Sequence, residues 1–437
     1  MMAIADRVVV LEWRLHGRAQ RSDPGNDNDE PGELDERLTV AVTLTKRRIS
    51  TGTILKMKRA ATRRFWCGAM AALQATAMAA LPCAVEASDG SVVAPDVPAL
   101  CRADIDFLPA FLTANDAGVQ SMVEAGHSPI DPSQTAYYEG LAVSVSSEEE
   151  CDALVQKYVS GIRRGHLEIR PELGRAASRP EPGAVVRLDF PDDRIALLKI
   201  SSFDQGTGVL LKKTLDQGKN RLRTHPLWII DVRGNSGGSD SEWDALLPRV
   251  GVARVAGFSG EFLATPDNVQ AFSQLLDSNR ASAQVQDKLR ELVARMQRAQ
   301  PGSYVQLFDQ VKRGSLMTFE YPATAVVPAK VLVMMDGGCA SSCEQFLLSV
   351  RQGWRVKLFG QNSAGILDYS NALPHMLPSN RRWVYYATSR SARLPDFPVD
   401  GRGLSPDVLY PAPATSDEGL QELKAAEAFL RSGDRRH

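Results

Sequence analysis

The chain has 437 residues and a formal net charge of −1, from 51 Lys and Arg against 52 Asp and Glu. Hydrophobic residues make up 43% of it, which is enough for the core of a globular protein and excludes a chain that is disordered throughout. The near-neutral charge gives no sign of nucleic-acid or anionic-membrane binding. The sequence also has no nucleotide motif and no metal-ligand spacing of His and Cys. We therefore expect no nucleic-acid partner, no metal and no cofactor.

The first 87 residues are expected to lie outside the folded domains. Residues 1–56 are polar and rich in Asp, Arg and Gly, which is typical of a disordered or non-native upstream extension. Residues 57–87 have the layout of a secretory signal peptide: a basic run, an apolar stretch and small residues before Ser88. A signal-anchor helix is the alternative, but about 17 apolar residues are marginal for a stable span. We expect translation to begin at Met57, export to the periplasm or the cell exterior, and no stable membrane span after cleavage.

Residues 88–183 are predicted to form a small helical domain, because apolar residues recur at helical spacing. These positions are Leu108, Phe111, Leu112, Ala136, Tyr137, Leu141, Leu154, Val155, Tyr158 and Val159. The last predicted helix runs into Gly165 and His166, and a short strand follows. A stretch rich in Arg, Glu, Pro and Gly over 170–183 then indicates a linker or an exposed loop.

An α/β domain is expected over residues 184–415. Strand-like apolar segments begin it, at 185–190 and 195–200. Residues 240–325 carry amphipathic helical segments, which predict a helical insertion. This insertion is either a lid over a cleft or scaffold packing, and the sequence favours neither. An amphipathic helix within 416–437 is expected to close the chain.

A glycine-rich turn follows the apolar strand predicted at 227–232. The turn reads Arg-Gly-Asn-Ser-Gly-Gly and ends at Gly237 and Gly238. Paired glycines permit positive φ and bring backbone N–H groups close to a ligand. Most Gly-Gly pairs are ordinary turns, so the pair alone does not identify a site.

A second turn of small residues carries the chemical signal. It reads Gly-Cys-Ala-Ser-Ser-Cys-Glu at 338–344, between a buried strand-like run at 329–336 and a helix-forming run at 345–350. Such a turn can project a serine hydroxyl at the top of a sheet, beside the first N–H groups of the helix. These N–H groups and the positive end of the helix dipole suit a developing oxyanion. The turn indicates a serine nucleophile, with a plain helix cap as the alternative.

Export would permit disulfides. After cleavage before Ser88, the remaining cysteines are Cys101, Cys151, Cys339 and Cys343, and three pairings are possible. Cys101 with Cys151 would staple the N-terminal helices. Cys339 and Cys343 would either bridge the small-residue turn or remain small buried thiols, and we favour the thiols.

Segments of this chain resemble, in the same order, the motifs of the carboxy-terminal-processing and tricorn-type serine peptidases. The run Asp-Val-Arg-Gly-Asn-Ser-Gly-Gly at 231–238 is similar to the family's Asp-Leu-Arg-Gly-Asn-x-Gly-Gly. Residues 339–344 resemble its small-Ala-Ser-x-Ser/small-Glu turn. The turn at 360–365 resembles Gly-Glu-x-Thr-x-Gly, and 401–407 resembles the closing Gly-x-Gly-x-x-Pro-Asp.

The resemblance implies a fold and a set of site residues. The fold would be α/β, with a ClpP/crotonase-like spiral β-sheet core and flanking helices, to which the helical N-terminal domain and the helical insertion are added. Aligned on Glu344, the family nucleophile falls on Ser341. The oxyanion donors carried over are the Ser342 N–H and a backbone N–H in the turn of Gly237 and Gly238.

The general base implied by the resemblance is a histidine. Bacterial tail-processing members use a lysine just after the Gly-Glu-x-Thr-x-Gly turn, but this chain has Ile366 there. The tricorn-like branch uses a histidine after a helix and a glycine, which matches His166; a structural histidine is the alternative. An imidazole suits proton transfer from Ser341. The orienting acid of that branch corresponds to Asp400, for which a turn role is the alternative.

The expected function is that of an exported serine hydrolase, first of all a peptidase acting on peptide or protein substrates. The interval from His166 to Asp231 is too short for a peptide-docking PDZ module, which agrees with the tricorn-like branch. The alternatives are a non-catalytic ligand- or peptide-binding protein on the same fold and an esterase with the same machinery.

Overall fold

The computed structural model describes residues 8–10, 96–171, 185–278, 283–308, 314–322, 324 and 328–432. Residues 1–7 and 11–95 lie outside these ranges. The expected signal peptide over 57–87 is therefore not described, and neither is the expected extension over 1–56 apart from Val8–Val10.

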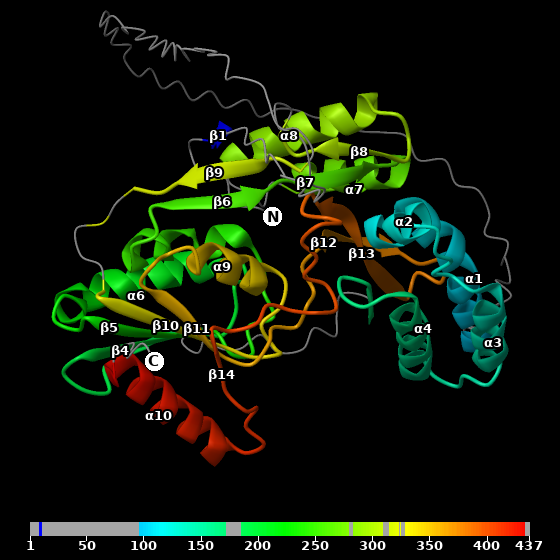
Figure 1. The fold of residues 1–437 in the computed structure, drawn as a ribbon. Coiled ribbons are helices and arrows are strands. Elements are labelled where there is room, and N and C mark those ends of the chain that lie inside the picture. The colour runs from blue at the N-terminus through cyan, green and yellow to red at the C-terminus, as the bar shows by residue number, and fades with distance from the viewer. Residues whose placement is uncertain are drawn as a thin grey trace, which may run out of the picture. The chain divides into compact units, whose positions relative to one another are not determined.

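The fold is mixed α/β, as expected (Figure 1). The described helices are α1 (Val97–Asn115), α2 (Ala117–Glu124), α3 (Pro132–Ala142), α4 (Glu148–Ile162), α6 (Thr207–Leu222), η1 (Asp240–Glu242), η2 (Asp244–Leu246), η3 (Pro248–Val250), α7 (Pro266–Asp277), α8 (Ala283–Arg298), α9 (Ser342–Val350) and α10 (Ser416–Ser432). The described strands are β1 (Val8–Val10), β2 (Glu168–Pro171), β3 (Val186–Asp189), β4 (Ile195–Ile200), β5 (Leu227–Asp231), β6 (Arg254–Phe258), β7 (Gly260–Ala264), β8 (Ser303–Gln306), β9 (Leu316–Glu320), β10 (Lys330–Met335), β11 (Val356–Gly360), β12 (Tyr369–Met376), β13 (Arg382–Ser391) and β14 (Val408–Leu409).

The 6-stranded sheet positions both predicted turns. Its order is β14-β11-β10-β5-β4-β3, with β10 parallel to its neighbours β5 and β11. The carboxyl ends of β5 and β10 therefore meet at one edge of the sheet, where ligands of open α/β sheets commonly bind. This arrangement brings the glycine turn and the small-residue turn together.

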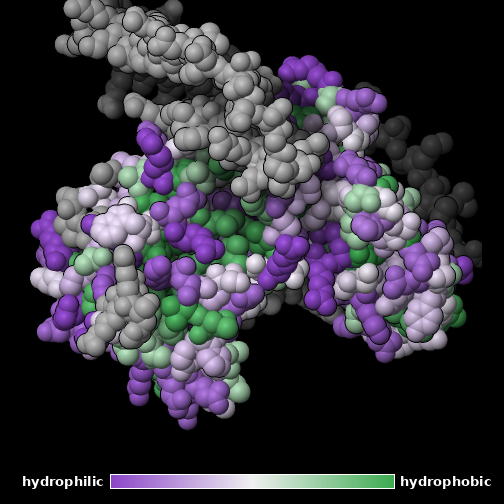
Figure 2. All heavy atoms as spheres, viewed as in Figure 1, coloured by the Kyte–Doolittle hydropathy of each residue, from purple (hydrophilic) through white to green (hydrophobic). Residues whose placement is uncertain are grey.

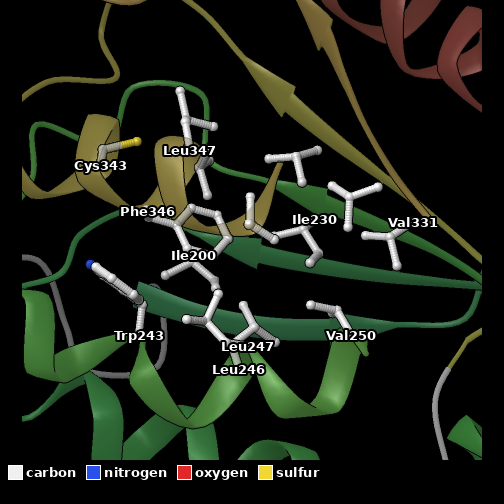
Figure 3. Packing of buried hydrophobic residues seen from close by; sticks show 14 of the residues in the cluster. Ile200, Ile230, Trp243, Leu246, Leu247, Val250, Val331, Cys343, Phe346 and Leu347 are labelled. Atoms are coloured by element: carbon white, nitrogen blue, oxygen red, sulfur yellow. The ribbon is translucent and has the colours of Figure 1, made fainter. Parts of the chain in front are cut away.

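Both faces of this sheet are buried, which explains the nearly continuous apolar character of its strands. Successive side chains of β5 point to opposite faces. Ile230 packs in one core with Phe346 and Leu347 of α9, as Figure 3 shows. Ile229 packs in the other core with Ala426 of α10. Burying each aliphatic side chain stabilises the sheet by about 2 kcal/mol.

The N-terminal helices share their core with a second sheet, of order β12-β13-β7-β8, in which β2 also pairs with β13. Val384 and Tyr386 of β13 lie in the same hydrophobic cluster as the helical residues Ile105 and Tyr158. The expected helical segment is thus docked onto β13. The strand β2, which follows His166 closely, is held there by its antiparallel pairing with β13.

The expected helical insertion over 240–325 contains α7 and α8, but it also contains strands. Of these, β7 and β8 extend the β13 sheet, whereas β6 pairs with β9 and β9 with β1. All of β7 is buried, so it lacks the alternating pattern that would identify a strand from sequence. The residues around Trp243 form short 3-10 helices rather than an α-helix.

Most of the exposed large hydrophobic residues lie on different elements, among them Val209 on α6, Trp354 after α9 and Phe397 after β13, but Tyr137 and Leu141 are both on α3. Hydrophilic and hydrophobic residues are interspersed on the face in view (Figure 2). In the part of the chain that the structure describes, no helix has both the length and the apolar character needed to cross a membrane.

A disulfide joins Cys101 of α1 to Cys151 of α4, which is one of the pairings that the sequence left open. Replacing both cysteines with serine should lower the free energy of unfolding by about 4 kcal/mol, because the bridge closes a loop and so reduces the conformational entropy of the unfolded chain. The two residues are 50 apart in sequence. Denaturant unfolding under oxidising conditions measures the loss, and an unchanged unfolding free energy would contradict it.

Candidate active site

Ser341 lies between β10 and α9, immediately before the first helical residue. Its φ is 56° and its ψ is −121°, a conformation that residues other than glycine rarely adopt. The Ser341 N–H donates to the carbonyl of Ile366 at 2.9 Å and to Oε2 of Glu344 at 3.2 Å. The surrounding structure therefore holds the strained turn from two sides and fixes the direction of the Ser341 hydroxyl.

His166 lies between α4 and β2, and its ring meets Ser341 although the two are 175 residues apart in sequence. The distance between His166 Nε2 and Ser341 Oγ is 2.9 Å, which is a hydrogen bond. The backbone of His166 also has positive φ, at 46°. Its Nδ1 is buried and has no hydrogen-bond partner among the described residues. The structure thus brings together the serine and the histidine that the sequence analysis selected.

The electrostatic environment favours the neutral imidazole. The pKa of His166 is lowered from its ordinary value of 6.5, first because burial penalises the charged ring and second because of the positive charge of Arg163. The carboxylates of Glu168 and Asp116 act in the opposite direction, and so does the backbone carbonyl of Tyr369, which acts on the ring as a weak acceptor although it makes no hydrogen bond of full geometry with Nδ1. A neutral ring next to a serine hydroxyl can accept its proton.

The position that holds a lysine in the bacterial branch is occupied here by Ile366, whose side chain packs against the turn that carries the histidine. A Cβ added at Gly165 would lie 2.4 Å from Ile366 Cγ2. Gly165 also has positive φ, at 72°. The isoleucine therefore contributes packing at the Gly165–His166 turn.

The glycine turn after β5 packs directly on the serine turn. Gly237 has φ of 100°, and a Cβ there would lie 2.6 Å from the carbonyl oxygen of Ala340 and 2.9 Å from the Ser342 nitrogen. Asn235 joins the two turns, because its carbonyl accepts a hydrogen bond from the Ala340 N–H at 3.1 Å. Only glycine fits between them at position 237.

Two backbone N–H groups, one in the serine turn and one in the glycine turn, are open. Those of Ser342 and Gly238 have no hydrogen-bond partner within the described ranges. The Gly237 N–H, in contrast, donates to Oδ1 of Asn235 at 2.9 Å. Of the two glycines proposed from sequence, Gly238 is therefore the one with a free donor, and Gly237 provides the close approach.

Comparison with known proteins concerns the family and the fold of the chain. The sequence profile described as "Peptidase family S41" matches residues 194–410, which include Ser341, both glycines and Asp400. The chain belongs to peptidase family S41. His166 precedes the matched range. No curated protein matches the chain significantly.

Solved structures resemble this S41 chain in fold. The crystal structure of mature CPAF superposes with a TM-score of 0.54 at 11% identity, covering 78% of this chain and 99% of that one. Mature CPAF complexed with lactacystin gives a TM-score of 0.52 at 10% identity, covering 77% and 97%. At these identities the likeness concerns the fold alone.

Asp400 of this S41 chain does not contact His166 directly in the described structure. Its Oδ1 accepts the N–H groups of Leu367 and Asp368, both at 2.6 Å. Burial raises the pKa of Asp400 to about 6. The acid thus fixes the segment that leads to Tyr369, whose backbone carbonyl acts on His166.

Glu344 joins two of the family motifs in this S41 site, the serine turn and the turn at 360–365. Glu344 lies in the first turn of α9, is fully buried, and accepts from Ser363 Oγ at 2.5 Å and from the N–H groups of Gly365 and Ile366, each at 2.8 Å. Its Oε2 also receives the Ser341 N–H. Glu344 therefore ties the third family motif to the serine turn.

A buried polar network below Ser342 was not predicted. Ser342 Oγ donates to Asp240 Oδ1 at 2.6 Å and accepts from Trp243 Nε1 at 3.0 Å. Burial raises the pKa of Asp240, and it raises that of the neighbouring Asp244 to about 7. Nothing in the sequence pairs these residues with a position about 100 residues later, because only the fold brings them together.

Cys339 and Cys343 form a disulfide across the serine turn, so the free thiols that we favoured from sequence are not what the structure contains. Both residues are fully buried. Their Cα atoms are 5.4 Å apart, close enough for a bridge because one turn of chain joins them. Within the described ranges, no group of three or more His, Cys, Asp or Glu side chains is placed to hold a metal ion.

Proposed function

We propose that this chain is an exported serine peptidase that cleaves peptide bonds through an acyl-enzyme on Ser341, with His166 as general base. Membership of peptidase family S41 supports a peptidase and implies a peptide or protein substrate. The observation that carries the assignment of roles is the 2.9 Å contact between His166 Nε2 and Ser341 Oγ. A nucleophile within hydrogen-bond reach of a base is the arrangement that acyl transfer needs.

The proposed reaction begins when His166 Nε2 takes the hydroxyl proton and Ser341 Oγ attacks the carbonyl carbon of the scissile peptide. The carbonyl oxygen becomes an oxyanion, which the free N–H groups of Ser342 and Gly238 stabilise. The protonated His166 then gives its proton to the leaving amine as the C–N bond breaks. Water, deprotonated by His166, attacks the ester carbonyl, and the proton returns to Ser341 Oγ as the acid product leaves.

Asp400 remains our candidate for the residue that orients His166. Its hydrogen bonds to Leu367 and Asp368 support an indirect role, in which it fixes the strand start that carries Tyr369. The carbonyl of Tyr369 would then stabilise the imidazolium that forms during catalysis, in agreement with its effect on the pKa of His166. Export is supported by two buried disulfides, which persist in oxidising compartments.

The direct test uses the full chain with denatured casein and, separately, p-nitrophenyl acetate. Peptide products found by mass spectrometry with the parent protein and missing with Ser341→Ala would support the peptidase. Turnover of the ester alone would favour the esterase. Folded protein that turns over neither substrate would overturn the proposal and favour a binding protein.

The pH dependence should reflect the environment of His166. Because the pKa of His166 is lowered, its imidazole stays neutral to a lower pH than an ordinary histidine. The acid limb of the kcat/KM profile should therefore have its midpoint below pH 6.5. Activity is then present above that midpoint and falls as pH drops through it. Stopped hydrolysis assays between pH 4 and 9 measure the profile, and a midpoint above pH 7 would contradict this environment.

A further inference from the structure

The turn that carries His166 needs an external support. His166 itself has positive φ, and Nδ1 of its imidazole makes no hydrogen bond of full geometry in the described structure. The support comes from Arg163, at the end of α4. Its guanidinium donates to the backbone carbonyls of Arg164 at 3.2 Å, of His166 at 3.3 Å and, at shorter range, of Gly165. One side chain therefore binds three consecutive carbonyls of the turn.

Arg163 is itself held by Asp116. Arg163 Nε lies 2.7 Å from Asp116 Oδ1, and Nη2 lies 2.5 Å from Oδ2. The side chains are 6% and 0% exposed, so the pair is shielded from water and from salt. A buried ion pair is not a reliable source of stability, because desolvation offsets the attraction. Its strict geometry indicates instead a role in placing the turn that Arg163 binds.

Asp116 connects this pair to two other elements. It caps α2, because its Oδ1 accepts the N–H groups of Gly118 at 2.9 Å and of Val119 at 2.8 Å. Its Oδ2 accepts the N–H of Ala387 on β13 at 3.0 Å. The position of the carboxylate is thus set by a helix and a strand, and the position of Arg163 follows from it.

The Arg163 side chain is packed so closely that a larger residue does not fit at the neighbouring position 118. A Cβ added at Gly118 would lie 2.6 Å from Arg163 Nε and 2.8 Å from its Cδ. A lysine could not reproduce the contacts, because one ammonium cannot bind both carboxylate oxygens and the three carbonyls at once. The site therefore fits arginine specifically.

We propose that Arg163 and Asp116 form a clamp that positions His166 for proton transfer with Ser341. They are positioning residues, since neither touches Ser341, and the inference rests on the proposed function. A misplaced base slows proton transfer steeply, because a shift of about 1 Å in a catalytic group can cost roughly 100-fold in rate.

The clamp also sets the charge around the imidazole. The groups that act on His166 are Arg163, which lowers its pKa, and Glu168, Asp116 and the Tyr369 carbonyl, which raise it. Removing the charge of Arg163 should therefore raise the pKa and move the acid limb of the pH profile to higher pH. A residue with only a packing role would not move this limb.

The test compares Arg163→Met, Arg163→Lys and the control Arg102→Met, whose parent side chain on α1 is 62% exposed. For Arg163→Met we expect kcat of peptide hydrolysis to fall roughly 10- to 100-fold, KM to stay within about threefold, and the acid limb to move to higher pH. Arg163→Lys should lose kcat similarly but keep the limb near its parent position, because the positive charge is retained. The control should keep the kcat and pH profile of the parent.

Circular dichroism establishes which variants fold. If Arg163→Met unfolds because it leaves Asp116 buried and unpaired, the double variant Arg163→Met/Asp116→Asn removes both charges and takes its place. Its kcat should fall as for Arg163→Met, but its acid limb should move less, because Asp116 raises the pKa of His166. Folded variants with the kcat of the parent and an unmoved acid limb would overturn the clamp. If His166→Ala also keeps the parent activity, the proposed function fails; if His166→Ala is inactive and the Arg163 variants are normal, only the clamp fails.

Discussion

Replacing Ser341 with alanine is expected to lower kcat/KM for peptide hydrolysis by at least about 10⁴-fold, because the acyl-enzyme can no longer form. Only the oxyanion donors and substrate binding would remain. The strained backbone at position 341 is held by hydrogen bonds from its N–H, which alanine retains, so the fold should persist. Initial rates with a fluorogenic peptide measure the loss.

The matched control for this prediction is Ser349→Ala. Ser349 lies on α9, the helix that Ser341 precedes, and is buried, but its hydroxyl donates to the Gln345 carbonyl within the helix, at 2.8 Å. Its replacement should leave kcat/KM within about threefold of the parent, because such local bonds contribute only about 1 kcal/mol. A Ser341→Ala protein with one tenth or more of the parent activity would contradict the assignment of the nucleophile.

Replacing Gly237 with alanine is expected to lower kcat/KM by roughly 100-fold or more, because oxyanion donors must keep their positions to within a fraction of an ångström. The added Cβ would meet the Ala340 carbonyl at 2.6 Å and Ser341 Cβ at 2.9 Å, so the two turns must move apart. The φ of 100° adds backbone strain. Steady-state kinetics measure the effect.

Gly234→Ala separates strain from displacement. Gly234 lies in the same turn with φ of 73°, but a Cβ there meets nothing within 4 Å. We expect it to cost about 1 kcal/mol of stability and to keep most of the activity. Equal activity losses in the two variants would mean that backbone strain, and not the approach of the turns, is what matters at Gly237.

The main elements could be predicted because they depend on local signals. The apolar strand at Leu227–Asp231 and the small-residue turn before α9 are each readable within about ten residues. The pairing of Ser341 with His166 could be predicted only through the family resemblance, since 175 residues separate them. Nothing in the periodicity of the sequence brings the two together.

What the sequence did not predict depends on contacts between distant segments. Asp116 and Arg163 are 47 residues apart and have no shared motif. The Gly237 N–H looked like an oxyanion donor until the structure placed Asn235 Oδ1 on it. The strand β7 was missed because complete burial removes its alternation. In each case, the outcome depends on tertiary packing between distant segments and not on the local sequence.

The most direct test of the central claim, that His166 activates Ser341, is labelling of the full chain with a fluorophosphonate probe, followed by peptide mapping. We predict that the parent is labelled on Ser341 and that both Ser341→Ala and His166→Ala, shown to be folded, are not. Labelling of Ser341 that survives in His166→Ala, or a folded parent protein that takes up no probe, would contradict the account.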